Sequence, residues 1–185
     1  MSAAREVFLE QGYEAASVND VVRRAGGSLA TLYAQFGNKE GLFLAVIQDQ
    51  NERFTREIIP QCVDGLPLEQ GLQKLGEQYL RTVVTRENLA LFRIVVAEGR
   101  KFPELMQRHL ISGADKVRTT VAAHLKKCAP DIKEPEVAAS IFMQIMGGRH
   151  QYRSLADQSY VVTEAEIVEY VRAGVNLFLY GLLPR

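Results

Sequence analysis

Hydrophobic positions recur with helical rather than alternating spacing along nearly the whole chain. Leu68, Leu72, Leu75 and Tyr79 lie three or four residues apart, which places them on one face of a helix. Similar stripes follow one another to the C-terminal end, separated by glycine, proline and capping residues. The pattern predicts nine helices and no sheet, so we expect an all-α fold. The predicted helices begin near residues 2, 17, 28, 38, 67, 85, 103, 135 and 163.

Start and stop signals divide these segments. Gly12 follows the first stripe and is expected to end its helix. Ser17 is expected to accept hydrogen bonds from main-chain N–H groups at the start of its helix. Asp20 is expected to accept one from the main-chain N–H of Ser17, and the two together would form a capping box. Thr163 and Glu166 have the same spacing and predict a second capping box before the last helix.

Composition narrows the class of protein. A chain of 185 residues with 47% hydrophobic and 24% charged residues can bury one core, or one core and a small added domain, which excludes a disordered or fibrous chain. The net charge of zero gives no general attraction to nucleic acid, although a local basic site remains open. No apolar run approaches the roughly 18 residues of a membrane span, and no secretory signal is visible, so we expect a cytoplasmic protein without a membrane partner. Cys62 and Cys128 are expected to be reduced thiols.

The usual catalytic motifs are missing from the sequence. It contains no dinucleotide-binding or phosphate-binding glycine loop, no His-Glu-x-x-His and no Gly-x-Ser-x-Gly. The histidines, His109, His124 and His150, are scattered, and nothing places them beside a nucleophile or as metal ligands. We therefore expect no catalytic residues, no metal and no cofactor, and an enzyme is the third-ranked interpretation.

Residues 17–36 have the spacing of a helix-turn-helix: a capped helix, a glycine-containing turn and a second capped helix. If Leu32 and Phe36 face inward, the opposite side of the second helix is small and polar. Thr31 could then contact a base or phosphate, and Gln35 could form two hydrogen bonds to adenine. The alternative is a plain helical hairpin whose alanines are only good helix formers. The expected outward positions are Ala30, Thr31 and Ala34, flanked by Tyr33 and Gln35.

The residues of segments 4–8, 12–13, 16–21, 25–28, 31–36 and 38–42 resemble the DNA-binding domain of the tetracycline-repressor (TetR) family. The resemblance implies an all-helical, homodimeric repressor whose residues 1–46 bind DNA and whose residues 47–185 bind a small ligand and dimerise. Segment 97–105 is similar to the regulatory domain of a multidrug-efflux-regulator-like branch. The partners implied are a double-stranded DNA operator, a small-molecule inducer and a second copy of the chain.

The resemblance also implies roles for single residues. Ser17, Tyr33 and Lys39 would hold phosphates, and Thr31 would contact a phosphate or a base. The base-reading positions would be Asn19, Leu29, Ala30 and Gln35, and Ser28 completes the expected DNA-binding set. The sequence departs from the family pattern at Gly27, usually aliphatic, at Ala30, usually glycine, and in lacking a basic arm before the first helix. Acidic residues slightly outnumber basic ones in 1–46, so we expect modest DNA affinity or a start codon further upstream.

The remaining helices are expected to form the effector site and the dimer interface. A ligand pocket between facing helices would have apolar walls and a few polar groups. The candidate walls are Tyr79, Phe92, Met143 and Met146, with Arg93 and His150 as polar groups. The candidate dimer residues are Ile141, Ile145, Val168, Val171, Val175 and Phe178. The alternatives are that these side chains are ordinary core, that Arg93 extends to solvent, and that the protein is a helical dimer that binds a small molecule without binding DNA.

Overall fold

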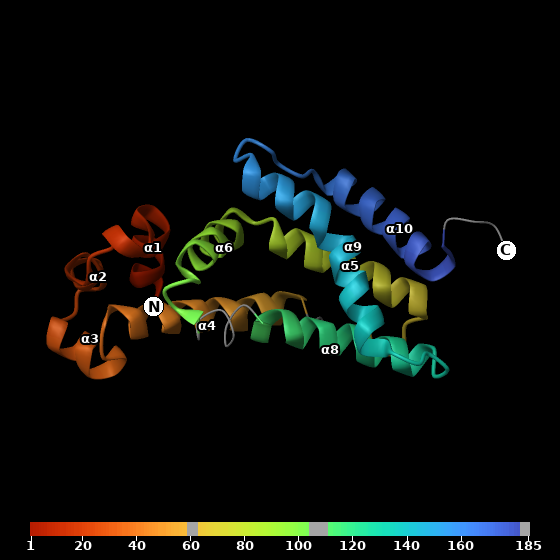
Figure 1. Ribbon diagram of the computed structural model, residues 1–185, viewed down its shortest axis with the longest axis horizontal. Coiled ribbons are helices and arrows are strands. Elements are labelled where there is room, and N and C mark those ends of the chain that lie inside the picture. Colours follow the sequence, from red (N-terminus) through yellow and green to blue (C-terminus); the bar gives the residue numbers. More distant parts are fainter. Residues whose placement is uncertain (59–62, 104–110, 182–185) are drawn as a thin grey trace. The chain divides into compact units, whose positions relative to one another are not determined.

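The described part of the chain is built from helices. The computed structural model describes residues 1–58, 63–103 and 111–181, and no strand occurs within those ranges, which confirms the all-α fold class (Figure 1). The helix predicted to begin near residue 103 falls partly on residues 104–110, outside the described ranges. The helices are α1 (Ser2–Ala15), α2 (Val18–Ala25), α3 (Leu29–Phe36), α4 (Lys39–Ile58), α5 (Leu68–Val83), α6 (Arg86–Glu98), α8 (Ile111–Cys128), α9 (Pro135–Ala156) and α10 (Glu164–Tyr180).

Side-chain caps define several helix starts. Ser28 accepts from the main-chain N–H of Thr31 at 3.1 Å and caps α3. At α10 the predicted capping box is confirmed: Thr163 Oγ1 accepts from the N–H of Glu166 at 3.3 Å, and the Glu166 carboxylate accepts from the N–H of Thr163 at 2.8 Å. These local hydrogen bonds satisfy N–H groups that have no partner within the helix.

The start of α2 corrects one prediction. Ser17 does accept from the N–H of Asn19 at 3.2 Å, but Asp20 does not complete a capping box. The Asp20 carboxylate instead accepts from Arg23 at 2.7 Å and from Gln11 at 3.3 Å. The guanidinium of Arg23, one turn later in α2, and the side-chain amide of Gln11 in α1 attract this carboxylate more strongly than the main-chain N–H of Ser17 does. The hydrogen bond from Gln11 also connects α2 to α1.

Gly12 ends the first helical stretch of α1, as the sequence predicts. Its backbone has φ 74° and ψ 177°, which breaks the helical path, and the helix resumes as far as Ala15. Glycine adopts a positive φ without the steric penalty of a side chain. The predicted end at Gly12 is therefore confirmed, and a short second helical stretch continues α1 to Ala15.

The chain divides into two compact units, Met1–Arg53 with Ala90–Gly113 and Phe54–Leu89 with Ala114–Arg185. In the first unit, α1 packs on α2 and α2 on α3. Its core contains Phe8 and Phe43, whose rings meet edge to face with centroids 4.9 Å apart. The sequence-based boundary at residue 46 remains a prediction about the DNA-binding domain.

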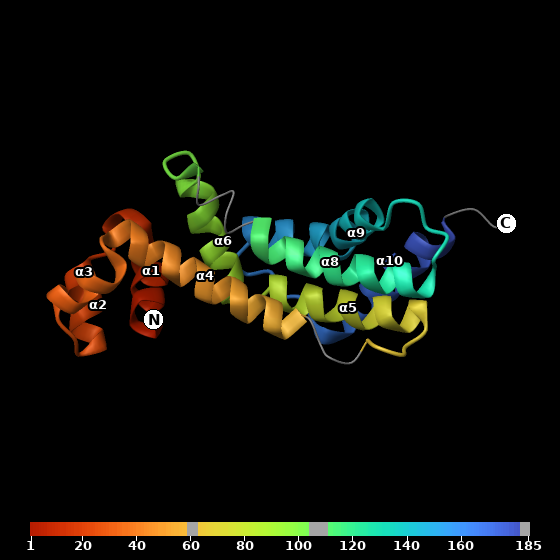
Figure 2. The ribbon, with the colours of Figure 1, turned by 90° about the horizontal axis from the view of Figure 1, so that it is seen from below.

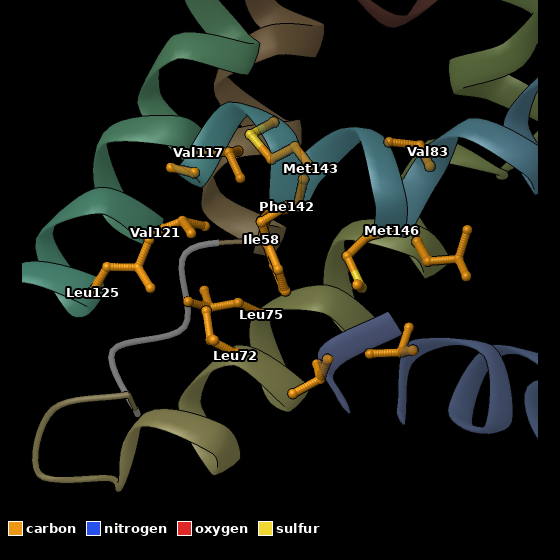
Figure 3. Close-up of a cluster of buried hydrophobic side chains, with 14 of the residues drawn as sticks. Ile58, Leu72, Leu75, Val83, Val117, Val121, Leu125, Phe142, Met143 and Met146 are labelled. Carbon is orange, nitrogen blue, oxygen red and sulfur yellow. The ribbon is translucent and has the colours of Figure 1, made fainter. Parts of the chain in front are cut away.

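In the second unit α5 packs against both α9 and α10. Figure 3 shows the core side chains, with Leu72 and Leu75 of α5 near Phe142 and Met146 of α9. An ideal Cβ added at Gly76 of α5 would lie 2.8 Å from Val171 Cγ1, closer than real Cβ contacts. The absence of a side chain at Gly76 therefore allows α10 to approach α5 closely.

Candidate functional site

A tight turn joins α2 to α3. Gly26 ends α2 in the left-handed conformation, with φ 70°, and its N–H donates to the carbonyl of Val22 at 3.0 Å. Gly27 does not have a positive φ, and a Cβ there would meet nothing within 4 Å. The glycine that departs from the family pattern thus occupies a position where the turn would also accept a larger residue.

The α3 helix buries one side and exposes the other. Leu32 is buried and Phe36 is partly buried against the core of the first unit. This matches the burial expected from sequence. Tyr33 is 47% exposed and Leu29 is 38% exposed, so both side chains are accessible to a partner. The exposed positions of this segment are Ser28, Leu29, Ala30, Thr31, Tyr33, Ala34 and Gln35.

The hydroxyl groups at the start of α3 are already paired with one another. Ser28 Oγ and Thr31 Oγ1 lie 2.9 Å apart, and Ser28 Oγ also accepts from the N–H of Thr31. Each hydroxyl still has unused hydrogen-bonding capacity, because it combines one donor with two acceptor lone pairs. Ser17 is half-buried and Asn19 is exposed at the corresponding start of α2.

Lys39 is held by the end of α1 at the point where α4 begins. Its Nζ donates to the main-chain carbonyl of Glu14 at 2.9 Å and lies 4.9 Å from the centroid of the Tyr13 ring. A cation over an aromatic face is stabilised by the ring quadrupole. The ammonium is therefore fixed in place rather than swinging freely in solvent.

Residues beyond α6 contact the same end of α1. Lys101 forms ion pairs with Glu14 and, at 3.3 Å, with Glu98. The rings of Tyr13 and Phe102 meet edge to face with centroids 5.0 Å apart. The sequence alone does not predict this cluster of Tyr13, Glu14, Lys101 and Phe102, because residues so far apart along the chain carry no local signal of their pairing.

The arginines of α2 are paired with carboxylates. Arg24 donates two hydrogen bonds to Glu10, at 2.8 and 2.5 Å, and Arg23 pairs with Asp20 at 2.7 Å. The hydrogen bond from Arg24 lowers the pKa of Glu10 below its usual value. Any phosphate that approaches these guanidinium groups would compete with internal acids, which fits the modest DNA affinity expected from the charge count.

The predicted ligand residues fall in both units. Phe92 and Arg93 are partly buried on the part of α6 in the first unit. Tyr79, Met143 and Met146 belong to the second unit, where burial raises the pKa of Tyr79 to about 12. Met146 is fully buried, and a Cβ at Gly174 would lie 2.5 Å from its methyl group, so Met146 fills the space between α9 and α10.

His150 lies in an aromatic cluster that sequence reasoning missed. Its Nδ1 is 2.7 Å from the hydroxyl of Tyr160, and its ring meets Tyr170 edge to face with centroids 4.5 Å apart. Tyr170 in turn donates to the carbonyl of Ile145 at 2.8 Å. Burial lowers the pKa of His150, and Arg149 lowers it further. The neutral imidazole is thus the favoured form at this site.

The predicted dimer residues separate into surface and core. Ile141 and Val168 are 51% and 40% exposed, and Ile145 and Phe178 are partly buried. Val171 and Val175, predicted for the dimer interface, are buried within the single chain at 0% and 1% exposure and so leave no free surface for a second copy. Val171 packs against Gly76 of α5, and both valines belong to the core of the second unit. Other exposed apolar residues of α9 and α10 are Val137, Tyr152, Leu177 and Tyr180.

The described residues contain neither a cluster of metal-ligating side chains nor a helix that could span a membrane. No group of three or more histidine, cysteine, aspartate or glutamate side chains in residues 1–58, 63–103 and 111–181 is placed to hold a metal ion. Within the same ranges, no helix has both the length and the apolar character needed to span a membrane.

Two sequence families match this chain. Residues 1–46 match the bacterial regulatory proteins of the tetR family, and residues 70–181 match the AefR-like transcriptional repressor, C-terminal domain. The HTH-type transcriptional repressor ComR of Escherichia coli (strain K12) is 46% identical over 54 residues, which cover 29% of this chain and 26% of ComR. The chain thus matches only about a quarter of the length of that relative.

Solved structures match over nearly the full length. The flavonoid-responsive regulator FrrA is 31% identical, with a TM-score of 0.80 over 100% of this chain and 95% of FrrA. A TetR-family transcriptional regulator from Mesorhizobium loti has a TM-score of 0.85 at 24% identity, over 96% of this chain and 92% of that one, which shows a shared fold. Since the family match at residues 70–181 alone spans more than half of the chain, the protein belongs to the tetR family of bacterial transcriptional regulators, which are generally not enzymes.

Proposed function

We propose that the protein is a cytoplasmic, ligand-responsive transcriptional repressor. A homodimer would bind a palindromic double-stranded DNA operator and leave it when a small-molecule inducer binds. The observation that carries this proposal is α3, which follows a capped helix and a glycine turn and exposes small and polar side chains opposite the buried Leu32. Membership in the tetR family supports the same function.

In this proposal α3 lies in the major groove. The small side chains of Ala30 and Ala34 would let the helix backbone approach the base edges, where Gln35 would read adenine. Phosphate contacts from Ser17, Tyr33 and Lys39 would set the position of the helix without reading sequence. Asn19, Ser28, Leu29 and Thr31 would complete the surface. In the dimer the two copies of α3 would lie about 34 to 36 Å apart, one turn of DNA.

We place the dimer interface on the exposed apolar face of α9 and α10. Ile141 and Val168 would be central, with Ile145 and Phe178 beside them, because these side chains retain apolar surface in the single chain. Val137 and Ile141 are one turn apart on α9 and are both exposed, so the apolar surface of this helix is longer than predicted. A second copy of the chain would remove it from water.

We propose an effector site in the regulatory part of the chain. Its candidate residues within the second unit are Tyr79, Met143, Met146 and His150, of which the fully buried Met146 is the least accessible. Phe92 and Arg93 belong to the first unit and remain separate candidates. The relative FrrA is named as flavonoid-responsive and is 31% identical over the whole chain. Flavonoids are therefore the first compounds to screen, by the increase in unfolding temperature that a ligand of the native state produces.

The rival function is a helical dimer that binds a small molecule without binding DNA. A mobility-shift titration with the intergenic DNA upstream of the protein's own gene separates the two, with coding DNA of equal length as the reference. We expect the intergenic fragment to bind more tightly than the reference at the same salt concentration. Equal weak binding of both fragments, with ligand binding intact, would favour the rival.

A further inference from the structure

The end of α1 after Gly12 is a short stretch, residues 13–15, whose place depends on other elements. Gly12 has φ 74° and breaks the helical path, so this stretch does not simply continue the direction of the helix before it. Figure 2 shows the first turns of α4 beside α1, and the two helices share the core of the first unit. Contacts with neighbouring elements therefore determine where Tyr13 and Glu14 lie.

The ring of Tyr13 is held by two aromatic rings and an ammonium. It meets Phe102 edge to face with centroids 5.0 Å apart, and the ring of Phe43 on α4 lies at the same distance. The Nζ atom of Lys39 is 4.9 Å from the centroid of the Tyr13 ring. Aromatic pairs and cation–π contacts both depend on the orientation of the ring, because the ring quadrupole is directional. A loss of the contact with Phe102 would therefore disturb the contact with Lys39.

Glu14 contacts two lysines with different groups. Its main-chain carbonyl accepts from Lys39 Nζ at 2.9 Å, and its carboxylate forms an ion pair with Lys101. Two adjacent residues of α1, Tyr13 and Glu14, thus connect Lys39 to Lys101 and Phe102, which lie shortly after α6.

Lys101 and Phe102 are themselves fixed to the end of α6. Their main-chain N–H groups donate to the carbonyl of Glu98 at 2.9 and 3.1 Å, and the Lys101 ammonium lies 3.3 Å from the Glu98 carboxylate. These hydrogen bonds hold the backbone at two successive residues, so both side chains reach α1 from a defined position. Every residue of this network belongs to the first unit.

We propose that Lys101 and Phe102 are positioning residues for the phosphate contact of Lys39. Phe102 holds the ring on which the ammonium rests, and Lys101 holds the residue whose carbonyl accepts from it. An ammonium has three donors, so the bond to Glu14 leaves two for a phosphate. A lysine restrained in this way loses less conformational entropy when it binds. The inference rests on the proposed DNA-binding function and adds to it two residues outside the helix-turn-helix.

The first test measures the position of Lys39 in the full chain without DNA. In protein with isotope-labelled lysine, the terminal CH2 signal of Lys39 is the one lost in Lys39→Arg, and the ring of Tyr13 displaces its proton resonance from that of exposed lysines. Phe102→Leu and Lys101→Met should each move this resonance towards the exposed lysines, because each removes one restraint on α1. An unmoved resonance in both variants would overturn the proposal.

The second test measures affinity for a short DNA duplex of arbitrary sequence by fluorescence anisotropy, since phosphate contacts do not require the operator. Phe102→Leu should weaken binding about two- to tenfold, the effect of having to order one long side chain on binding. The same substitution in a Lys39→Ala background should cause no further loss, because no lysine remains to be positioned. Equal losses in both backgrounds would show a general weakening of the unit and would contradict the proposal.

Two variants separate the ion pair of Lys101 from its charge. Lys101→Arg keeps a cation opposite Glu14 and should retain the parental affinity and the parental Lys39 resonance. Arg100→Met removes the same charge from an exposed residue one position earlier and should leave the Lys39 resonance unmoved. If Arg100→Met moves the resonance as far as Lys101→Met does, the effect belongs to charge and the positioning role of Lys101 is wrong.

The outcomes also distinguish this inference from the proposed function. A parent that binds no DNA would overturn the proposed function and this inference with it, whereas the failures described above leave DNA binding intact and overturn only the positioning role. If Phe102→Leu loses the helical circular-dichroism spectrum of the parent, Lys101→Met decides, because its side chain is exposed at the surface of the unit.

Discussion

The Nζ atom of Lys39 donates a hydrogen bond to the main-chain carbonyl of Glu14 at 2.9 Å. The same ammonium lies over the ring of Tyr13, so the end of α1 orients the lysine that begins α4. A long side chain that is already restrained loses less conformational entropy when it binds a partner. This preorganisation suits a residue whose proposed role is to hold a DNA phosphate.

Replacing Lys39 by alanine should weaken binding to operator and to unrelated DNA by similar factors. Phosphate contacts contribute to both kinds of binding, because they do not read base sequence. The slope of log K against log salt concentration should also become shallower by about one unit for each lost contact. Fluorescence anisotropy at four salt concentrations measures both quantities.

Lys133→Ala is the matched control for Lys39→Ala. Lys133 is an exposed lysine in the second unit, just before α9. Its removal lowers the net charge of the chain by the same amount but should leave the salt slope unchanged. If the two variants have the same slope, Lys39 does not contact a phosphate.

Gln35→Ala should change sequence preference more than overall affinity. A glutamine that forms two hydrogen bonds to one adenine discriminates against other bases by about 1 to 3 kcal/mol. Loss of the amide should relax preference at one position of each half-site and spare binding to unrelated DNA. Competition with operators altered at single positions shows the effect, whereas a uniform loss on all sequences would assign Gln35 to the phosphate contacts.

Lys101→Met should lower the free energy of unfolding of the first unit, because it leaves the carboxylate of Glu98 without its ion-pair partner. The Glu98 residue is 9% exposed, its Oε2 has no hydrogen-bond partner among the described residues, and Lys101 is its ion-pair partner at 3.3 Å. Because the lysine is more than half exposed, solvent screening keeps the expected loss small. Glu98→Gln in the Lys101→Met background should recover part of this loss, since it removes the unpaired charge. Urea unfolding of both variants measures the free energies, and no recovery would mean that Lys101 acts only through Glu14.

Ile141→Glu combined with Val168→Glu should give folded monomers that no longer bind operator tightly. Both side chains are exposed in the single chain, so the new carboxylates cost little in the monomer but would be buried across the proposed interface. Val171→Glu is the contrasting variant, because it places a charge in the core at 0% exposure and should unfold the second unit. Sedimentation velocity and circular dichroism distinguish the two results, and a dimer that survives the double substitution would move the interface elsewhere.

Local signals made the helices and the exposed face of α3 predictable. A capping residue such as Ser28 acts within its own turn, and the spacing of Leu32 and Phe36 fixes which side of α3 faces inward. The same reasoning located the break at Gly12. It could not show that the helix resumes after the break, because a single residue with a positive φ is compatible with either outcome.

Tertiary placement decided what the sequence could not. The helical spacing of Val171 and Val175 indicates that both are buried, either in the core of the single chain or against a second copy. It cannot separate the two, because an intrachain core and a dimer interface require the same apolar stripe. In the folded chain Val171 packs against Gly76 of α5, nearly a hundred residues away, and the sequence gives no local sign of that contact. The contacts of Lys39 with Tyr13 and Glu14 likewise join separate helices, so no pattern within one helix reveals them.

The environment of His150 predicts how stability depends on pH. Burial lowers its pKa below the ordinary value of 6.5, Arg149 and Arg153 lower it further, and Glu166 opposes them. Arg153 also stacks on Tyr160, 4.0 Å from the ring centroid, so the group that bonds to His150 is itself fixed. The folded protein therefore holds the imidazole neutral at a pH where the unfolded chain already binds a proton.

The free energy of unfolding should accordingly fall as the pH drops from 7.5 to 5.5. Below 6.5 the unfolded chain takes up a proton at His150 first, and the loss of stability stops growing once the pH is below the folded-state pKa. The lowered pKa values of carboxylates such as Glu166 affect stability at more acidic pH, where those groups become protonated, so this window isolates histidine.

His150→Gln retains a group that can bond to Tyr160 but cannot titrate, and its decline between the two pH values should be smaller than that of the parent. Tyr160→Phe removes the hydrogen bond and keeps the titrating ring, so it should be less stable throughout yet still show the decline. Urea unfolding at pH 7.5, 6.5 and 5.5 provides the comparison, and an equal decline in the parent and in His150→Gln would show that another group controls stability in this range.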